Sequence, residues 1–158
     1  MGHKSIIFGY IEGSPYWTDY PKAFKILQEH NAKIILGLPE EDSYPAISRG
    51  MFCTPNLQNR TLVYRSQIIH FGSSIKSIEF SDIPEWIDKF ESLLKRLFWY
   101  EAEVHIKTDI RGDLRLLWEA DDSIHSSYHK GDPQPTTNWR RSQFGDEFDE
   151  FHEPLQFN

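Results

Sequence analysis

The stretch between residues 81 and 120 constrains the fold of this chain more than any other part of its sequence. It opens with SDIPEWIDKFESLLKRLFWY, in which Asp82 followed by Glu85 is the sequence signature of a helix capping pair. An apolar stripe at helical spacing follows, made of Trp86, Phe90, Leu93, Leu94 and Leu97. Next, EAEVHIKTDI and DLRLLWEA flank a turn at Arg111 and Gly112, and the first alternates apolar with polar residues. We therefore predict an amphipathic helix followed by an antiparallel hairpin with one buried face.

Weaker patterns precede this helix. Short apolar runs bounded by turn residues indicate strands, and an apolar spacing of three to four residues indicates a second helix. In chain order we predict a strand over 4–13, a helix from about 18 to 31, a short buried strand over 33–38, an irregular excursion over 39–59, and strands over 60–72 and 75–80. Two helices and several strands in this order predict an α+β fold, with a mostly antiparallel sheet packed by two main helices.

The chain has the size and composition of one domain. It contains 158 residues, of which 39% are hydrophobic and 15% aromatic, so it is long and apolar enough to form a sizeable core. Within this single domain, 1–158, we predict an α+β body over 1–128 and a Pro-rich connector over 129–142. An acidic, aromatic C-terminal tail over 143–158 completes it.

Charge is distributed unevenly along the sequence. The formal net charge is -7, yet residues 1–100 hold eleven acids and eleven Lys or Arg. Residues 101–141 hold eight acids and six bases, whereas residues 142–158 hold five acids and no base. Such asymmetry indicates a localised acidic surface that binds a basic protein. It argues against nucleic acid as a partner, because phosphates would be repelled.

The tail offers candidate binding residues. If the tail is helical, Phe144, Phe148 and Phe151 share one face, which either docks on the body or anchors a partner protein. The segment LLWEADD adds further aromatic and acidic residues to the same third of the chain. The predicted partner-binding residues are Asp146, Glu147, Phe148, Asp149, Glu150 and Glu153 in the tail, and Trp118, Glu119, Asp121 and Asp122 before it.

One strand carries side chains that could bind a metal. In EAEVHIK, Glu101, Glu103 and His105 lie on one face of the predicted strand, and carboxylates with an imidazole suit a divalent cation. The simpler interpretation is the solvated face of a strand. Glu103 and Lys107 are four residues apart, which is not the spacing of a nuclease motif that pairs an acid with a lysine on a strand. We predict that the protein binds neither a metal nor a cofactor.

Other reactive residues give weaker signals. His125 and His129 are four residues apart, but their surroundings predict a loop without the glutamate of a zinc-protease helix. Cys53 is more often a small buried hydrophobe than a nucleophile. The sequence contains no GxSxG, P-loop or GxGxxG motif. We therefore predict that the protein is not an enzyme.

The sequence also predicts a cytoplasmic protein. No stretch approaches the roughly 18 apolar residues of a membrane span, so no membrane partner is expected. The start, MGHKSIIFGYIEG, does not have the pattern of a secretory signal, and a single cysteine excludes an internal disulfide.

Three segments resemble a known group of proteins. SIIFGYIEGSPYW, YRSQIIHFG and LLKRLFWYEAEVHIKTD are similar in texture and order to the small bacterial immunity proteins of polymorphic toxin systems, of the Rhs and contact-dependent growth inhibition types. The resemblance covers residues 1–120. It implies a cytoplasmic α+β protein that neutralises one cognate toxin domain without catalysis. Such toxins are often nucleases, and the acidic inhibitor then mimics the phosphate backbone.

Two alternatives to an immunity protein stay open at this stage. One is a non-toxin adaptor or assembly subunit that binds a basic protein, and the other is a metal-dependent hydrolase. The sequence leaves open whether the protein is a monomer or a homodimer.

Overall fold

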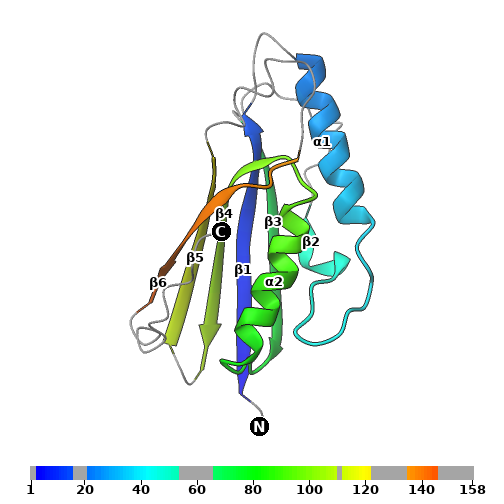
Figure 1. The fold of residues 1–158 in the computed structure, drawn as a ribbon. Coiled ribbons are helices and arrows are strands. Elements are labelled where there is room, and N and C mark those ends of the chain that lie inside the picture. The colour runs from blue at the N-terminus through cyan, green and yellow to red at the C-terminus, as the bar shows by residue number, and fades with distance from the viewer. Residues whose placement is uncertain (1–2, 16–20, 54–65, 110–111, 122–134, 146–158) are drawn as a thin grey trace.

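The computed structural model describes residues 3–15, 21–53, 66–109, 112–121 and 135–145 (Figure 1). These residues form one sheet, two α-helices and a short 3-10 helix. The elements are β1 (Lys4–Pro15), α1 (Pro21–Leu36), η1 (Arg49–Met51), β2 (Phe52–Cys53), β3 (Ser66–Lys76), α2 (Asp82–Leu94), β4 (Trp99–Thr108), β5 (Gly112–Ala120) and β6 (Trp139–Phe144).

The sheet has six strands in the order β2-β3-β1-β4-β5-β6, and all neighbouring strands are antiparallel. The predicted α+β class is therefore confirmed. The predicted hairpin is confirmed as β4 and β5, which pair from Glu101 opposite Glu119 to Thr108 opposite Gly112. Gly112 has a φ of 79°, which a residue with a side chain rarely adopts, and this explains the glycine at the turn.

Both helices contribute to a core on one face of the sheet (Figure 1). Every second residue of β4 and β5 points into this core, because side chains alternate along a strand. A series of aromatic rings crosses it from β2 to β5. Phe52, Phe71, Phe90 of α2 and Trp118 have successive ring centroids 5.4, 5.4 and 5.0 Å apart. The predicted stripe of α2 is confirmed, with Trp86, Phe90, Leu93, Leu94 and Leu97 all buried.

The predicted strand over 33–38 is wrong, because α1 continues to Leu36. Asn31 has the appearance of a helix stop in the sequence, but its side chain is 1% exposed within the helix. Its amide nitrogen donates to the carbonyl of Phe98 at 2.8 Å, and its amide oxygen accepts from the Phe98 N–H at 2.8 Å. A residue distant in sequence therefore gives this asparagine its partner, and the helix continues past it.

The predicted strand over 75–80 is also wrong. β3 ends at Lys76, and the chain then turns into α2. The Ile78 N–H donates to Ser5 Oγ at 3.0 Å, which ties the turn to β1. Asp82 is the first helical residue rather than the cap, and its carboxylate accepts from the N–H of Glu79 at 2.9 Å.

The short strand β2 and the edge strand β6 were not predicted. β6 occupies residues 139–144, where the sequence predicted the end of the connector and the start of the tail. Trp139 packs against Trp99 with ring centroids 5.8 Å apart, and Arg141 bonds to Glu91 of α2 at 2.5 Å. Arg141 lies on the core side of β6, where an alternating strand pattern would have an apolar residue, so the pattern is not visible in the sequence. Phe144 is a strand residue and not the first residue of a helical face.

Candidate functional site

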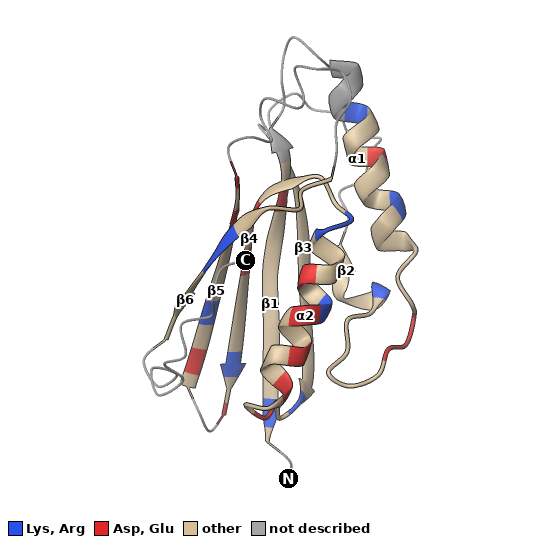
Figure 2. Ribbon diagram, in the orientation of Figure 1, with Lys and Arg blue, Asp and Glu red and all other residues tan. Residues whose placement is uncertain are grey.

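Negative charge gathers on the helical side of the molecule, along α2 and the loop beside it (Figure 2). The described residues contain sixteen acids, and eight of them lie in residues 40–42 and 79–91, which contain a single lysine. Two of the eight are engaged inside the molecule, Asp42 with Lys89 and Glu91 with Trp118 and Arg141. We call the remaining exposed or half-exposed set the acidic surface, which consists of Glu40, Glu41, Glu79, Asp82, Glu85 and Asp88.

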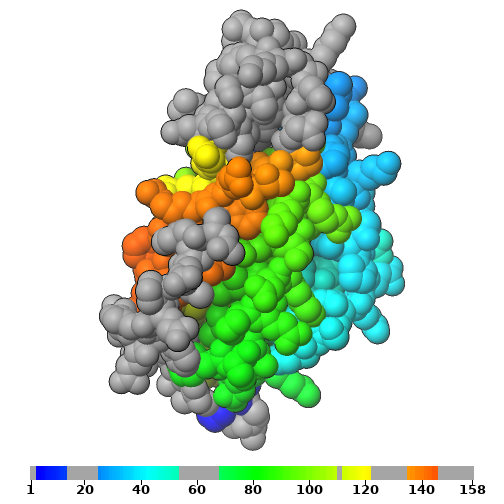
Figure 3. Space-filling view, viewed as in Figure 1, coloured from blue at the N-terminus to red at the C-terminus, as the bar shows by residue number. Residues whose placement is uncertain are grey.

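A charged contact fixes the loop against α2, so that the two acidic segments lie side by side (Figure 3). Lys89 Nζ donates to Asp42 Oδ2 at 2.9 Å and to the carbonyl of Ser43 at 2.7 Å. The same Asp42 oxygen accepts from the Ile47 N–H at 2.9 Å. Burial alone would raise the pKa of Asp42, but the bonds from Ile47 and Lys89 outweigh it and hold this pKa below its usual value.

Part of the acidic surface is bonded within the molecule, and part of it is exposed to a partner. Glu40 pairs with Arg49, and Asp82 accepts its bond from the backbone of Glu79. Glu85 and Asp88 are exposed on the outer side of α2. The helix dipole favours acids in the first turn of a helix, which explains the presence of Asp82 and Glu85 in α2. It does not explain Asp88, which lies beyond the first turn.

The sequence placed the binding residues elsewhere, and the structure corrects part of that prediction. Trp118 is 0% exposed, and its Nε1 donates to Glu91 Oε1 at 2.9 Å, so it is not on a partner-facing surface. It follows Leu114 and Leu116 on the buried side of β5, because side chains alternate along a strand. The alternation of the strand determines the direction of its side chain, and the acids next to it in the sequence do not.

The other predicted residues are separated by the fold. Glu119 faces the opposite side of β5 and pairs with Arg140, and Asp121 is exposed, with its N–H donating to the Asn138 carbonyl at 3.1 Å. Seven predicted residues lie outside the described part of the chain, namely Asp122, Asp146, Glu147, Phe148, Asp149, Glu150 and Glu153.

A second polar cluster lies on the face of the sheet opposite the helices. Its centre is Glu103, which accepts four bonds: from Arg115 Nε at 2.6 Å and Nη2 at 3.2 Å, from His105 Nε2 at 2.7 Å and from the Tyr10 hydroxyl at 3.2 Å. The bond from Arg115 holds the pKa of Glu103 below its usual value, although burial opposes this and His105 assists. The Tyr10 hydroxyl also donates to Glu101 at 2.6 Å. Burial and this bond raise the pKa of Tyr10 far above its usual value.

This geometry is that of an ion-pair network and not of a metal centre. Both Glu103 oxygens are used by Arg115, and the His105 ring stacks on Phe8 with centroids 4.8 Å apart. Within the described ranges, no group of three or more His, Cys, Asp or Glu residues is arranged to hold a metal ion. The alternative metal site at Glu101, Glu103 and His105 is therefore not formed. His125 and His129 lie outside the described residues.

Cys53 was predicted to be buried, and this is wrong. Its side chain is exposed on β2, directly opposite His70 of β3. Phe52 before it points into the core, and the alternation of the strand therefore turns Cys53 outward.

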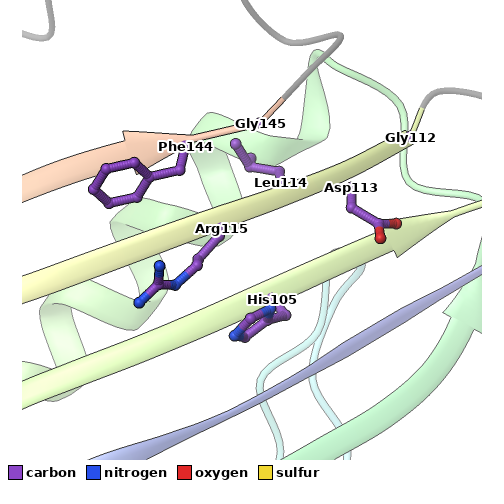
Figure 4. Close-up of a pocket in the computed structure, with 7 residues that line it drawn as sticks. All are labelled: His105, Gly112, Asp113, Leu114, Arg115, Phe144 and Gly145. Carbon is purple, nitrogen blue, oxygen red and sulfur yellow. The ribbon is translucent and has the colours of Figure 1, made fainter.

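A shallow pocket of about 470 Å³ lies beside the Glu103 cluster, across the ends of β4, β5 and β6 (Figure 4). His105, Arg115 and Phe144 form a row across the three strands, and Asp113 lies near the start of β5. The guanidinium of Arg115 lies 5.3 Å from the centre of the Phe144 ring. Phe144 is 49% exposed, which leaves an aromatic surface open beside a cation.

The role of the Glu103 charge can be measured through pH. Because the pKa of Glu103 is lower in the folded protein than in the unfolded chain, its charge stabilises the fold above the unfolded pKa of about 4.3 and this contribution is lost as pH falls. We expect Glu103→Gln to be less stable than wild type at pH 7. The difference should shrink as pH falls below the unfolded pKa and through the lower folded pKa, where the wild-type carboxylate is protonated in both states. Urea unfolding at several pH values tests this, and a pH-independent difference would contradict it.

Comparisons with protein-family models, with curated proteins and with solved structures gave no match. The described helices include none that is long and apolar enough to cross a lipid bilayer. The resemblance to immunity proteins therefore stays a prediction, and the function is inferred from the two surfaces themselves.

Proposed function

We propose that this protein is a cytoplasmic, non-catalytic inhibitor that binds a basic toxin domain through its acidic surface, as an immunity protein does. The observation that carries the proposal is the separation of charge. Half of the described acids lie in residues 40–42 and 79–91, beside only one lysine. This pattern supports the basic partner that the sequence predicts, although it lies on α2 and its neighbouring loop and not in the tail.

The acidic surface has the rigidity that a specific interface requires. α2 is held on the sheet by six buried residues, and Lys89 fixes the adjoining loop through Asp42 and Ser43. Carboxylates on such a preorganised surface lose little freedom on binding. Their combined field also speeds the encounter with a basic protein. A nuclease active site, which binds phosphates, is a basic surface of this kind.

The toxin proposal makes a prediction about charge reversal. We expect the double variant Glu85→Lys with Asp88→Lys to bind the cognate toxin domain at least tenfold more weakly, mainly through a slower association rate. Both residues are exposed on α2, so the fold should persist. The toxin domain to be tested is one encoded directly upstream, where an immunity gene is expected to have its toxin gene, and titration calorimetry measures the affinity. Growth rescue on co-expression measures neutralisation.

Glu29→Lys is the matched control, because Glu29 is an exposed helical acid on α1 whose side chain is 52% exposed. It should bind like wild type. Equal loss of affinity in the control and the double variant would show a general charge effect rather than an interface. Wild-type protein that neither binds nor neutralises the toxin would reject the immunity proposal. Binding to a basic protein other than a toxin would favour the adaptor alternative.

The contribution of the tail to binding can be tested in the same assay with a truncated protein. The fold determines where the truncation should begin. A truncation after Arg141 would remove Ser142 to Phe144 from β6 and disturb the sheet. A truncation after Gly145 keeps β6 complete and removes only residues outside the described part. Unchanged affinity would remove the tail from the proposed interface, and a large loss would place it there.

A further inference from the structure

The face of the sheet opposite the helices, which we call the open face, is divided by charge along the strands. At one end, Glu12, Glu101 and Glu119 lie opposite one another on β1, β4 and β5. Like charges directly opposite on neighbouring strands destabilise a sheet. Glu101 is bonded to the neutral hydroxyl of Tyr10, whereas Glu119 pairs with Arg140, so the row holds three carboxylates and one arginine.

The other end of the open face carries lysines. Lys4 lies opposite Lys76 on β1 and β3, and Lys107 lies opposite Ile6 on β4 and β1. Asp113 opposite Lys107 and Asp109 near the Lys4 N–H offset this charge in part. The lysine end is nevertheless more basic than the glutamate end, which has Arg140 as its only described base. The open face is therefore bipolar.

Apolar and aromatic groups lie between the two charged ends. Phe8 is 36% exposed and Ile6 is 37% exposed, and both are on the central strand β1. His105 stacks on Phe8, and Lys107 Nζ lies 5.9 Å from the Phe8 ring centre. Phe144 is exposed at the edge of the same face. Exposed aromatic rings surrounded by charged groups are typical of a protein interface.

The charge pattern has the symmetry of a self-complementary interface. Lys4 and Glu12 are each four residues from Phe8 on β1. Lys107 and Glu101 are each three residues from Val104 on β4, which pairs with Gly9, one residue beyond Phe8 on β1. A two-fold axis that lies in the interface plane, perpendicular to the strands, therefore brings Glu12 of one copy toward Lys4 and Glu101 toward Lys107 of a second copy. Glu119 approaches Asp113 of the second copy under this axis, but it is already paired with Arg140. We propose that two copies of this chain pair through their open faces in such a dimer.

The area and the internal bonding of the open face agree with this proposal. Six strands about 4.8 Å apart, over roughly eight residues of about 3.4 Å each, span about 24 by 27 Å. The resulting area of roughly 650 Å² is near the 800 Å² or so that each partner of a standard interface buries. Glu103 already accepts bonds from Arg115, His105 and Tyr10. Covering it would therefore leave no unpaired carboxylate.

The dimer goes beyond the proposed function and does not depend on it. Both helices pack on the opposite face of the sheet, so each copy keeps its acidic surface on the outside of the dimer. Toxin binding and self-association are thus assigned to different surfaces. A failure of one leaves the other intact.

Charge exchange at Glu101 and Lys107 tests the dimer. In the proposed geometry Glu101 meets Lys107 of the second copy, and the contact occurs twice. Glu101→Lys alone and Lys107→Glu alone each place like charges together, and we expect each to raise the dimer dissociation constant about tenfold or more. An equimolar mixture of the two variants restores both opposite-charge contacts. It should form a heterodimer with nearly wild-type affinity, measured by sedimentation equilibrium.

Salt and a control variant complete the experiment. Wild type should dimerise more tightly at about 0.01 M than at about 1 M salt, where the Debye length falls from about 30 to about 3 Å. Asp88→Lys, on the acidic surface, should dimerise like wild type. Wild type that is monomeric at low salt would overturn the proposal. Dimers unaffected by either single variant, or single variants that do not recover on mixing, would overturn it as well.

Discussion

Gly9→Ala should lower the free energy of unfolding by about 3 kcal/mol or more, although it adds only one methyl group. Gly9 lies in the middle of β1, between Phe71 of β3 and Val104 of β4. A Cβ at this position would lie 1.9 Å from the carbonyl oxygen of Glu103 and 2.9 Å from the Phe71 ring. No rotamer relieves a clash with backbone, so β1 and β4 would have to separate.

Gly72→Ala is the matched control, because Gly72 lies on the neighbouring strand opposite Phe8. Its added Cβ would be 3.5 Å from Phe8 Cβ and 3.6 Å from the Ile7 oxygen, which is ordinary van der Waals contact. We expect Gly72→Ala to be within about 0.5 kcal/mol of wild type, or slightly more stable. Urea unfolding of both variants measures the difference. Equal stability of the two would show that the strands adjust to a methyl group at Gly9.

The sequence predicted those elements whose patterns are local. α2 and the β4–β5 hairpin each carry their own periodicity, and they fix the α+β class and the buried face of the sheet. The elements that it missed depend on distant partners. β6 includes Arg141, whose inward position is explained by Glu91 fifty residues earlier. A window of the length used to recognise a strand or a helix does not contain both residues.

The candidate site shows the same limit in terms of charge. Residues 1–100 contain eleven acids and eleven bases, so their net charge gives no sign of an acidic surface. The fold separates these charges. The acidic loop 40–42 lies beside the acidic segment 79–91, which includes most of α2, whereas Lys22, Lys25 and Lys33 belong to α1. The acidic surface on α2 and its neighbouring loop is therefore visible in the fold, whereas a charge count over residues 1–100 does not reveal it. Trp118 failed as a binding residue for a related reason, since its direction follows the strand and not its acidic neighbours.

The second large effect is expected at Asn31, which joins α1 to the start of β4. Asn31→Ala would leave both the N–H and the carbonyl of Phe98 without their partner, in a residue that is 6% exposed. Each unsatisfied buried group costs about 1–3 kcal/mol, so we expect a loss of about 3 kcal/mol. His30→Ala on the same helix removes one bond to the exposed Arg96 carbonyl and an edge contact with the Phe98 ring, with centroids 4.7 Å apart. It leaves no buried backbone group of Phe98 without its partner, so it should cost less than Asn31→Ala, about 1 kcal/mol.

Asn31→Asp separates the hydrogen bonds from the packing, because the two side chains have nearly the same shape. An ionised carboxylate accepts from the Phe98 N–H but opposes the Phe98 carbonyl, and it is buried, so its folded pKa should be raised. A raised folded pKa means that the variant regains stability relative to wild type as pH falls, when the protonated oxygen donates to that carbonyl. Unfolding measured from pH 7 to pH 4 should therefore show the gap to wild type narrowing. A constant gap would mean that the Phe98 carbonyl does not require a donor, and that packing alone holds α1 against the sheet.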